Sequence, residues 1–179
     1  MKLFNLILFI SLVAVGCNSE DPFISNEDEL ITTVIYTLTP VAGGDPVVFS
    51  FQDLDGEGST PPVIINGTLN ANTVYNGELS LLNETTTPPE DIGAEVGEES
   101  EDHQFFFAHE GSLAINVLYA DTDTNGDPLG LLTTLETGVA SAGELVITLK
   151  HLPKKPNNGT LADAGGVSDV EVVFSVTIQ

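Results

Sequence analysis

The chain has very few of the residues that recognise phosphate. It contains no arginine and only four lysines against 27 acidic residues, so its formal net charge is −23. Nucleic acids and anionic lipid surfaces are bound largely through Lys and Arg. We therefore expect no nucleic-acid partner. The same acidity attracts cations and favours solubility at a crowded cell surface.

Residues and motifs typical of catalysis are also scarce. Tryptophan is absent, which disfavours a stacking site for sugars, and the chain has three histidines and one cysteine, Cys17. Neither a G-x-S-x-G elbow nor an H-E-x-x-H motif occurs. A single cysteine excludes an intramolecular disulfide, so the stability must come from a packed core. We expect a protein that is not an enzyme.

The first sixteen residues have the pattern of a targeting segment. Lys2 precedes a short apolar run, Leu3 to Val15, which lacks the roughly twenty residues of a transmembrane helix. The residues before Cys17, Ala14-Val15-Gly16, resemble a bacterial lipobox. The resemblance implies cleavage after Gly16 and diacylation of Cys17, with palmitate among the expected acyl groups. This lipid would anchor the chain to a membrane. The alternative is an ordinary secretory signal with an unrelated cysteine.

Residues 17–28 are polar and acidic and form the predicted tether. Their start, Asn18-Ser19-Glu20-Asp21, resembles the acidic export signals of surface lipoproteins in the Bacteroidetes. We therefore expect an outer-membrane location, either exposed at the cell surface or facing the periplasm. Cleavage removes Lys2 and leaves three lysines against 27 acids, a net charge of −24.

Residues 29–179 have the pattern of one β-sandwich domain. Alternating apolar residues and Gly, Pro and Asn turns favour an all-β, antiparallel sandwich of seven to nine strands, immunoglobulin-like in architecture only. Phe105-Phe106-Phe107 puts apolar side chains on both faces, which favours a central strand. The predicted strands are Glu29–Thr39, Val47–Phe51, Val63–Leu69, Thr73–Leu82, Gln104–His109, Leu113–Tyr119, Leu129–Glu136, Glu144–His151 and Asp169–Ile178.

One acidic stretch, Pro88 to Asp102, departs from this alternation. Ile92 and Val96 are four residues apart, which would place them on one face of a helix, whereas Gly93 and Gly97 disfavour a helix. We expect a short acidic helix or an ordered loop packed on the sandwich.

The sequence Asp121-Thr122-Asp123-Thr124-Asn125-Gly126 predicts a calcium loop. Oxygen side chains at Asp121, Asp123 and Asn125, followed by a glycine, have the spacing that wraps around a hard cation. The acid that closes an EF-hand is missing, because Leu132 stands at loop position twelve. A long hairpin turn requires the same residue types, so that alternative stays open.

A second candidate metal site involves His103. It follows a run of acids and would pair with Glu99 if the helix continued that far, giving a carboxylate–imidazole site for zinc, copper or iron. His151, from another strand, is a third candidate ligand. His109 would lie ~20 Å from His103 along an extended strand, too far to share an ion. A strand-start histidine beside solvated acids is the alternative.

Six stretches of the mature domain carry a resemblance to known proteins: Glu29–Val34, Phe51–Gly56, Tyr75–Gly77, Leu82–Glu84, Glu101–Phe106 and Asp121–Gly126. In these stretches the domain resembles a group of small lipoproteins from Flavobacteria and related bacteria. Members carry labels such as "type 1 periplasmic binding fold superfamily protein" or "GTP cyclohydrolase". Neither label agrees with these residues, because the first requires alternating strands and helices and the second requires zinc ligands and basic groups.

These patterns leave two functional hypotheses. The first is a lipid-anchored binding or interaction module of the cell envelope, stabilised by calcium. The second is a lipoprotein that captures zinc, copper or iron for an outer-membrane transporter.

Overall fold

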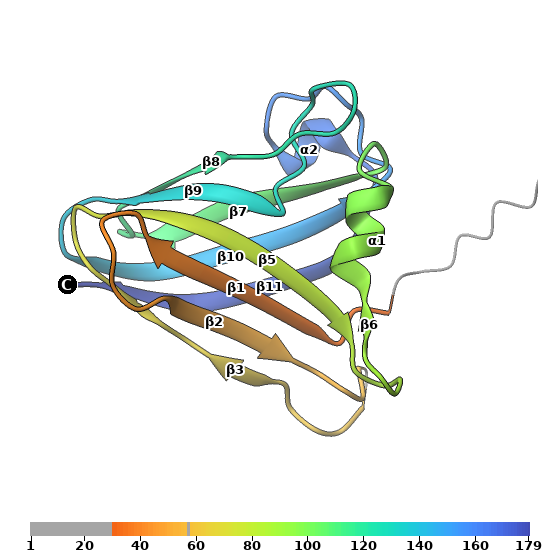
Figure 1. Cartoon of the computed structure of the whole chain (residues 1–179), viewed down its shortest axis with the longest axis horizontal. Coiled ribbons are helices and arrows are strands. Elements are labelled where there is room, and N and C mark those ends of the chain that lie inside the picture. Colours follow the sequence, from red (N-terminus) through yellow and green to blue (C-terminus); the bar gives the residue numbers. More distant parts are fainter. Residues whose placement is uncertain (1–29, 57) are drawn as a thin grey trace, which may run out of the picture.

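A computed structural model describes residues 30–56 and 58–179. Its eleven strands form two sheets that face each other (Figure 1). The first sheet contains β1 (Thr33–Pro40), β2 (Val47–Gln52), β3 (Val63–Ile65), β5 (Val74–Asn83), β6 (Glu90–Asp91), β8 (Ile115–Tyr119) and β9 (Leu132–Thr137). The second contains β4 (Thr68–Leu69), β7 (His103–Gly111), β10 (Ser141–His151) and β11 (Val167–Ile178). Two helices accompany them, α1 (Ile92–Glu98) and α2 (Leu161–Ala164).

The predicted all-β sandwich is confirmed. The first sheet has the order β3-β2-β1-β5-β9-β8, with β6 added beside β5, and the second has the order β4-β11-β10-β7. Every pair of strands is antiparallel except β4 and β11, which run parallel. The described residues contain eleven strands rather than seven to nine, because one predicted strand is divided and β6 follows a turn that the sequence pattern did not reveal.

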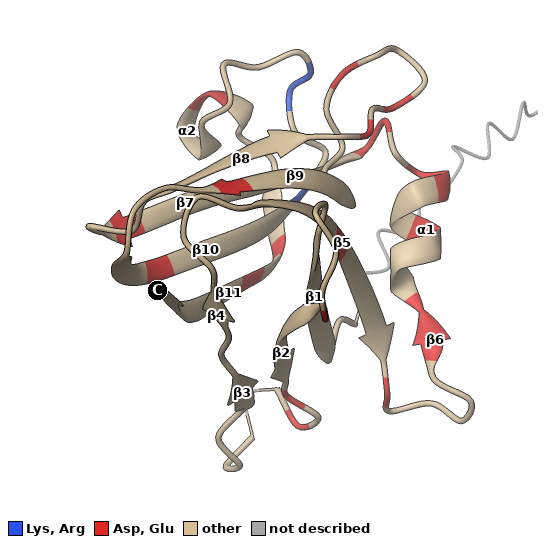
Figure 2. Cartoon of the chain, turned by 60° about the vertical axis from the view of Figure 1, so that its left-hand side comes forward, with Lys and Arg blue, Asp and Glu red and all other residues tan. Residues whose placement is uncertain are grey.

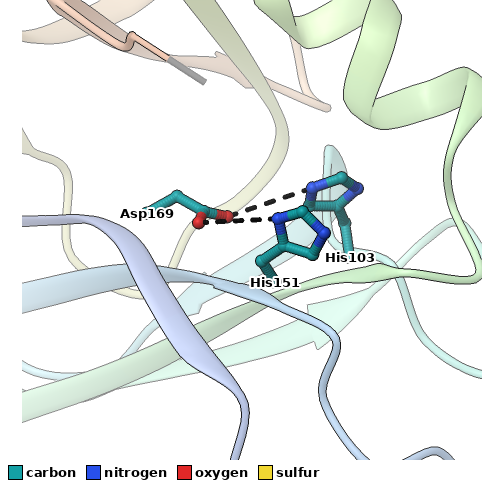
Figure 3. Close-up of side chains that lie close together, drawn as sticks. All are labelled: His103, His151 and Asp169. Atoms are coloured by element: carbon teal, nitrogen blue, oxygen red, sulfur yellow. Dashed lines mark ion pairs between the residues drawn. The ribbon is translucent and has the colours of Figure 1, made fainter. Parts of the chain in front are cut away.

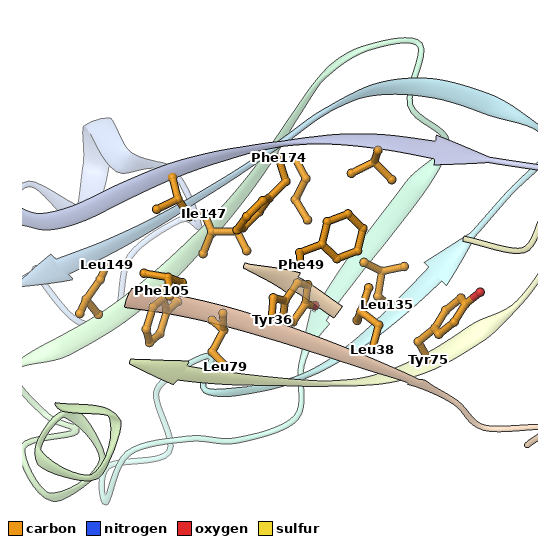
Figure 4. Close-up of a cluster of buried hydrophobic side chains, with 14 of the residues drawn as sticks. Tyr36, Leu38, Phe49, Tyr75, Leu79, Phe105, Leu135, Ile147, Leu149 and Phe174 are labelled. Carbon is orange, nitrogen blue, oxygen red and sulfur yellow. The ribbon is translucent and has the colours of Figure 1, made fainter. Parts of the chain in front are cut away.

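Alternation along the strands builds the core between the two sheets (Figure 4). In β1, Tyr36 and Leu38 are fully buried, whereas Thr39 between Leu38 and the end of the strand is exposed. Phe49 from the first sheet meets Phe174 from the second, with ring centroids 5.6 Å apart. Burial of these aromatic rings supplies a large share of the apolar area that a domain without disulfides needs.

The predicted strand Val63–Leu69 is divided between the two sheets. β3 pairs with β2, and the chain then crosses to place β4 beside β11. Gly67 permits this crossing, because a Cβ atom there would lie 2.5 Å from Val47 and 2.9 Å from the Phe49 ring. The alternation of apolar residues could not reveal the break, since it depends on this close tertiary approach.

Helix α1 lies within the acidic stretch for which the sequence predicted a helix. The Asp91 carboxylate accepts a hydrogen bond from the Ala94 N–H group and so caps the first turn. Ile92 and Val96 are buried in the core cluster, as their spacing predicted. The helix packs on β5 and ends just before the turn that leads into β7.

The prediction that Phe105–Phe107 lies in a central strand is wrong, because β7 is an edge strand of the second sheet. Phe106 is nevertheless 4% exposed. The segment after β10 returns along this region, where the Asn157 amide donates to Gln104 Oε1 (2.7 Å). The loop after β10 therefore contacts β7 at Gln104, and the Tyr119 hydroxyl of β8 donates to the Phe105 carbonyl (2.7 Å).

The predicted signal peptide, Cys17 and the tether lie outside the described residues. Within residues 30–56 and 58–179, no helix is long and apolar enough to cross a bilayer.

Gly77 provides a test of the packing between β5 and its neighbours. A Cβ atom at Gly77 would overlap the Thr133 hydroxyl and lie 2.7 Å from the Tyr36 hydroxyl, two groups that are hydrogen-bonded to each other at 2.7 Å. We predict that Gly77→Ala lowers the free energy of unfolding by roughly 1–3 kcal/mol. Urea denaturation measures this, with the exposed neighbour Asn76→Ala as the control. Equal stabilities of the two variants would contradict this packing.

Candidate metal centre

The two histidines nearest the end of the second sheet are cross-strand partners. His103 is the first residue of β7 and His151 the last residue of β10, and the antiparallel register places them directly opposite each other. Paired residues project from the same face, so both histidines continue the inward-facing row formed by Phe105 and Leu149. Their ring centroids are 4.7 Å apart.

A β-bulge brings Asp169 to the same place. Leu149 pairs with Val170 but Lys150 pairs with Ser168, so Asp169 is an extra residue in β11. A bulge of this kind changes the direction of a side chain relative to the regular pleat. The Asp169 side chain is 6% exposed and points toward both imidazole rings (Figure 3).

The three side chains converge on one point. His103 Nε2 and His151 Nδ1 each lie 3.9 Å from an oxygen of the Asp169 carboxylate. One ligand atom from each residue lies within 4.8 Å of the others. Since zinc binds nitrogen and oxygen ligands at about 2.0–2.2 Å, shifts of about half an ångström would bring all three atoms onto one ion.

The environment of His103 suits a metal ligand. His103 Nδ1 lies 3.1 Å from the Glu99 carbonyl oxygen, which can only accept, so in a hydrogen bond this nitrogen carries the proton. In the neutral ring, the lone pair is then on Nε2, the atom that faces Asp169. Metal-binding histidines are commonly oriented by such a second contact. Burial is the main cause that lowers the pKa of His103, so the ring is mainly neutral at pH 7.

The predicted partnership of His103 and Glu99 takes a different form in the structure. The assigned contact is with the Glu99 backbone carbonyl, and Glu99 is an exposed residue. The structure instead brings together His103, His151 and Asp169, whereas His109 is exposed further along β7. Sequence reasoning named His151 but missed Asp169, because no pattern in the sequence revealed the bulge.

The carboxylates of the predicted calcium loop accept hydrogen bonds from backbone N–H groups of the protein. The Asp121 carboxylate accepts from the N–H groups of Gly130 (2.7 Å) and Leu132 (2.9 Å). Asp123 Oδ1 accepts from the N–H groups of Asn125 and Asp127, both at 2.9 Å.

Asp123 Oδ2 accepts from Lys155 Nζ at 3.1 Å. An ammonium group therefore contacts the carboxylate at the centre of the predicted loop. In the described part of the chain, the one cluster of three His, Cys, Asp or Glu side chains with converging ligand atoms is that of His103, His151 and Asp169. Calcium binding at Asp121, Asp123 and Asn125 stays a prediction.

A scan against protein-family models and searches of curated proteins and of solved structures found no match to this chain.

The Asp123 carboxylate predicts a loss of stability in acid. Burial raises its pKa, but the hydrogen bonds from Lys155, Asp127 and Asn125 outweigh burial and hold the pKa below its ordinary value of 3.8. A depressed pKa in the folded state contributes stability above the unfolded-state pKa, and this stability is lost as the pH falls through the folded-state pKa. The advantage of the wild type over Asp123→Asn should therefore be constant above about pH 5 and shrink below about pH 4. Urea denaturation between pH 3 and 7 measures it, and a constant difference down to pH 3 would contradict the assignment.

Proposed function

We propose that this chain is a non-catalytic lipoprotein of the cell envelope that binds a divalent transition-metal ion through His103, His151 and Asp169. The observation that carries the proposal is the convergence of two imidazoles and one carboxylate from three strands. Two of these residues are cross-strand partners and the third is delivered by a bulge, so the fold itself holds them together.

The ligand set favours zinc, copper or ferrous iron over calcium. Imidazole nitrogen suits these transition metals, whereas calcium and magnesium prefer sites made of oxygen atoms alone. Three protein ligands leave a fourth position for water in a tetrahedral zinc site. The His151 side chain is 18% exposed, so solvent reaches the site beside this ring.

Burial of the cluster supports capture of an ion rather than catalysis. His103 is fully buried and the Asp169 side chain is 6% exposed, which leaves a substrate little access to an ion between them. Figure 2 shows acidic residues on both sheets, on α1 and on the loops. Such a surface raises the local concentration of cations and so favours delivery of a metal ion.

The anchoring part of the proposal rests on the sequence. Acylation of Cys17 would hold the domain at the outer membrane, where an outer-membrane transporter is the partner that fits a metal-capture role. The calcium-stabilised module remains a separate hypothesis, which depends on Asp121 and Asp123.

Thermal unfolding of the purified protein tests the metal site. After removal of metals with EDTA, we predict that Zn²⁺ at about one hundred times its dissociation constant stabilises the fold by about 2.7 kcal/mol. For a protein of this size, the melting temperature should rise by roughly 5–10 °C. His151→Ala should abolish the rise because it removes one of three ligands, whereas the exposed His109→Ala should retain it.

Two results would contradict the proposed site. The first is the absence of any Zn²⁺ effect on the wild type. The second is an undiminished rise in either His151→Ala or Asp169→Asn, which would place the ion elsewhere. A rise with millimolar Ca²⁺ that Asp121→Ala and Asp123→Ala each abolish would support the calcium-stabilised module instead.

A further inference from the structure

Lys155 differs from its neighbour Lys154 in the burial of its side chain. Its side chain is 7% exposed, whereas that of its neighbour Lys154 is 64% exposed and pairs with Asp163 at the surface. Lys155 Nζ donates to Asp123 Oδ2 at 3.1 Å and to the Ser100 carbonyl at 2.6 Å. Residues 30–56 and 58–179 contain three lysines, and the side chain of one of them, Lys155, is largely buried.

A buried ion pair requires a physical explanation beyond stability. Removing both charges from water is costly, and a pair of apolar side chains of similar size often stabilises a fold equally well. In some proteins, such a pair holds one particular arrangement of segments. The segments that Lys155 joins therefore indicate what it does.

The first of these segments leads directly into the metal centre. Ser100 follows Glu99, whose carbonyl accepts both from His103 Nδ1 (3.1 Å) and from the Asp102 N–H group (2.9 Å). A bond from Lys155 to the Ser100 carbonyl therefore holds the turn that orients the His103 ring.

The second segment carries the other histidine. Lys155 lies four residues after His151, and the Leu152 N–H group donates to the Asp102 carbonyl at 2.6 Å. The Asp121–Gly126 loop is joined to the same turn, because the Thr124 hydroxyl donates to the Glu101 carboxylate. Lys155 thus lies where the turn before β7, the segment after β10 and this loop meet.

We propose that Lys155 is a positioning residue for the metal centre. Its ammonium group serves as the internal cation of the Asp121–Gly126 loop and fixes the turn that carries His103 relative to the segment that carries His151. This inference rests on the proposed function, because the role of Lys155 is measured through the affinity and geometry of the bound metal ion.

A neutral replacement of the pair tests this role. Lys155→Met combined with Asp123→Asn removes both charges, and the asparagine oxygen still accepts from Asn125 and Asp127. We predict that this double variant binds Zn²⁺ about tenfold more weakly than the wild type. This is the lower end of the range for groups that contact a metal ligand directly, because Lys155 acts through the Ser100 carbonyl. A control is Lys154→Met, which removes one lysine charge at the neighbouring surface position and should leave the affinity unchanged.

A second readout separates positioning from a general loss of stability. Co²⁺ at saturation reports the geometry around the ion through its visible absorption spectrum, measured at a temperature where every variant is folded. The spectrum should change in the double variant and match the wild type in Lys154→Met. If the double variant does not fold, Lys155→Ala leaves room for water beside Asp123 and serves for the same measurements.

The outcomes separate the two proposals. If the wild type binds Zn²⁺ and Co²⁺ but the Lys155 variant has the same affinity and spectrum, the positioning role is overturned and the metal site stands. If the wild type binds neither ion, both proposals fall. A tenfold loss of affinity with an altered Co²⁺ spectrum, absent from Lys154→Met, supports the positioning role.

Discussion

The hydrogen-bonded register of the second sheet is the constraint on which the candidate site depends. The β7–β10 ladder places His103 opposite His151, and the β10–β11 ladder with its bulge adds Asp169. A shift of one residue along either ladder would turn the paired side chains to the other face of the sheet. The apolar rows beside the histidines fix the register, because Phe105, Ile147 and Leu149 must all face the core. The packing of the core and the assembly of the site therefore depend on the same strand register.

Polar groups buried at the end of an apolar core are costly unless they are hydrogen-bonded, paired with an opposite charge or bound to a metal ion. Two histidines and an aspartate occupy such a position, with His103 fully buried and oriented by a backbone carbonyl. A cation placed between them would interact with the carboxylate and both ring nitrogens in surroundings that screen charges weakly. The same region contains a buried ion pair, Lys155 and Asp123, which connects the adjoining loops. The proposed metal ligands and this ion pair therefore lie near the same end of the second sheet.

Sequence patterns predicted the parts of this structure that depend on local periodicity. Alternation located most strands, and the spacing of Ile92 and Val96 located the buried face of α1. The sequence also singled out His103, but it could not pair it with Asp169, because the bulge arises only when two strands are aligned. Likewise, the spacing of Asp121 and Asp123 suggested a bound cation, whereas the contact with Lys155, distant in sequence, emerges only from folding. The sequence therefore predicted the local features of these segments, but it could not predict which residues distant in sequence contact them.

The central claim is that one ion binds between the side chains of His103, His151 and Asp169. A crystal structure of the zinc-loaded protein, with anomalous diffraction data collected on both sides of the zinc absorption edge, tests it most directly. The account predicts an anomalous peak within about 2.0–2.2 Å of His103 Nε2, His151 Nδ1 and an Asp169 oxygen. Peaks found solely at surface carboxylates, or in the Asp121–Gly126 loop, with none between the two imidazole rings, would contradict it.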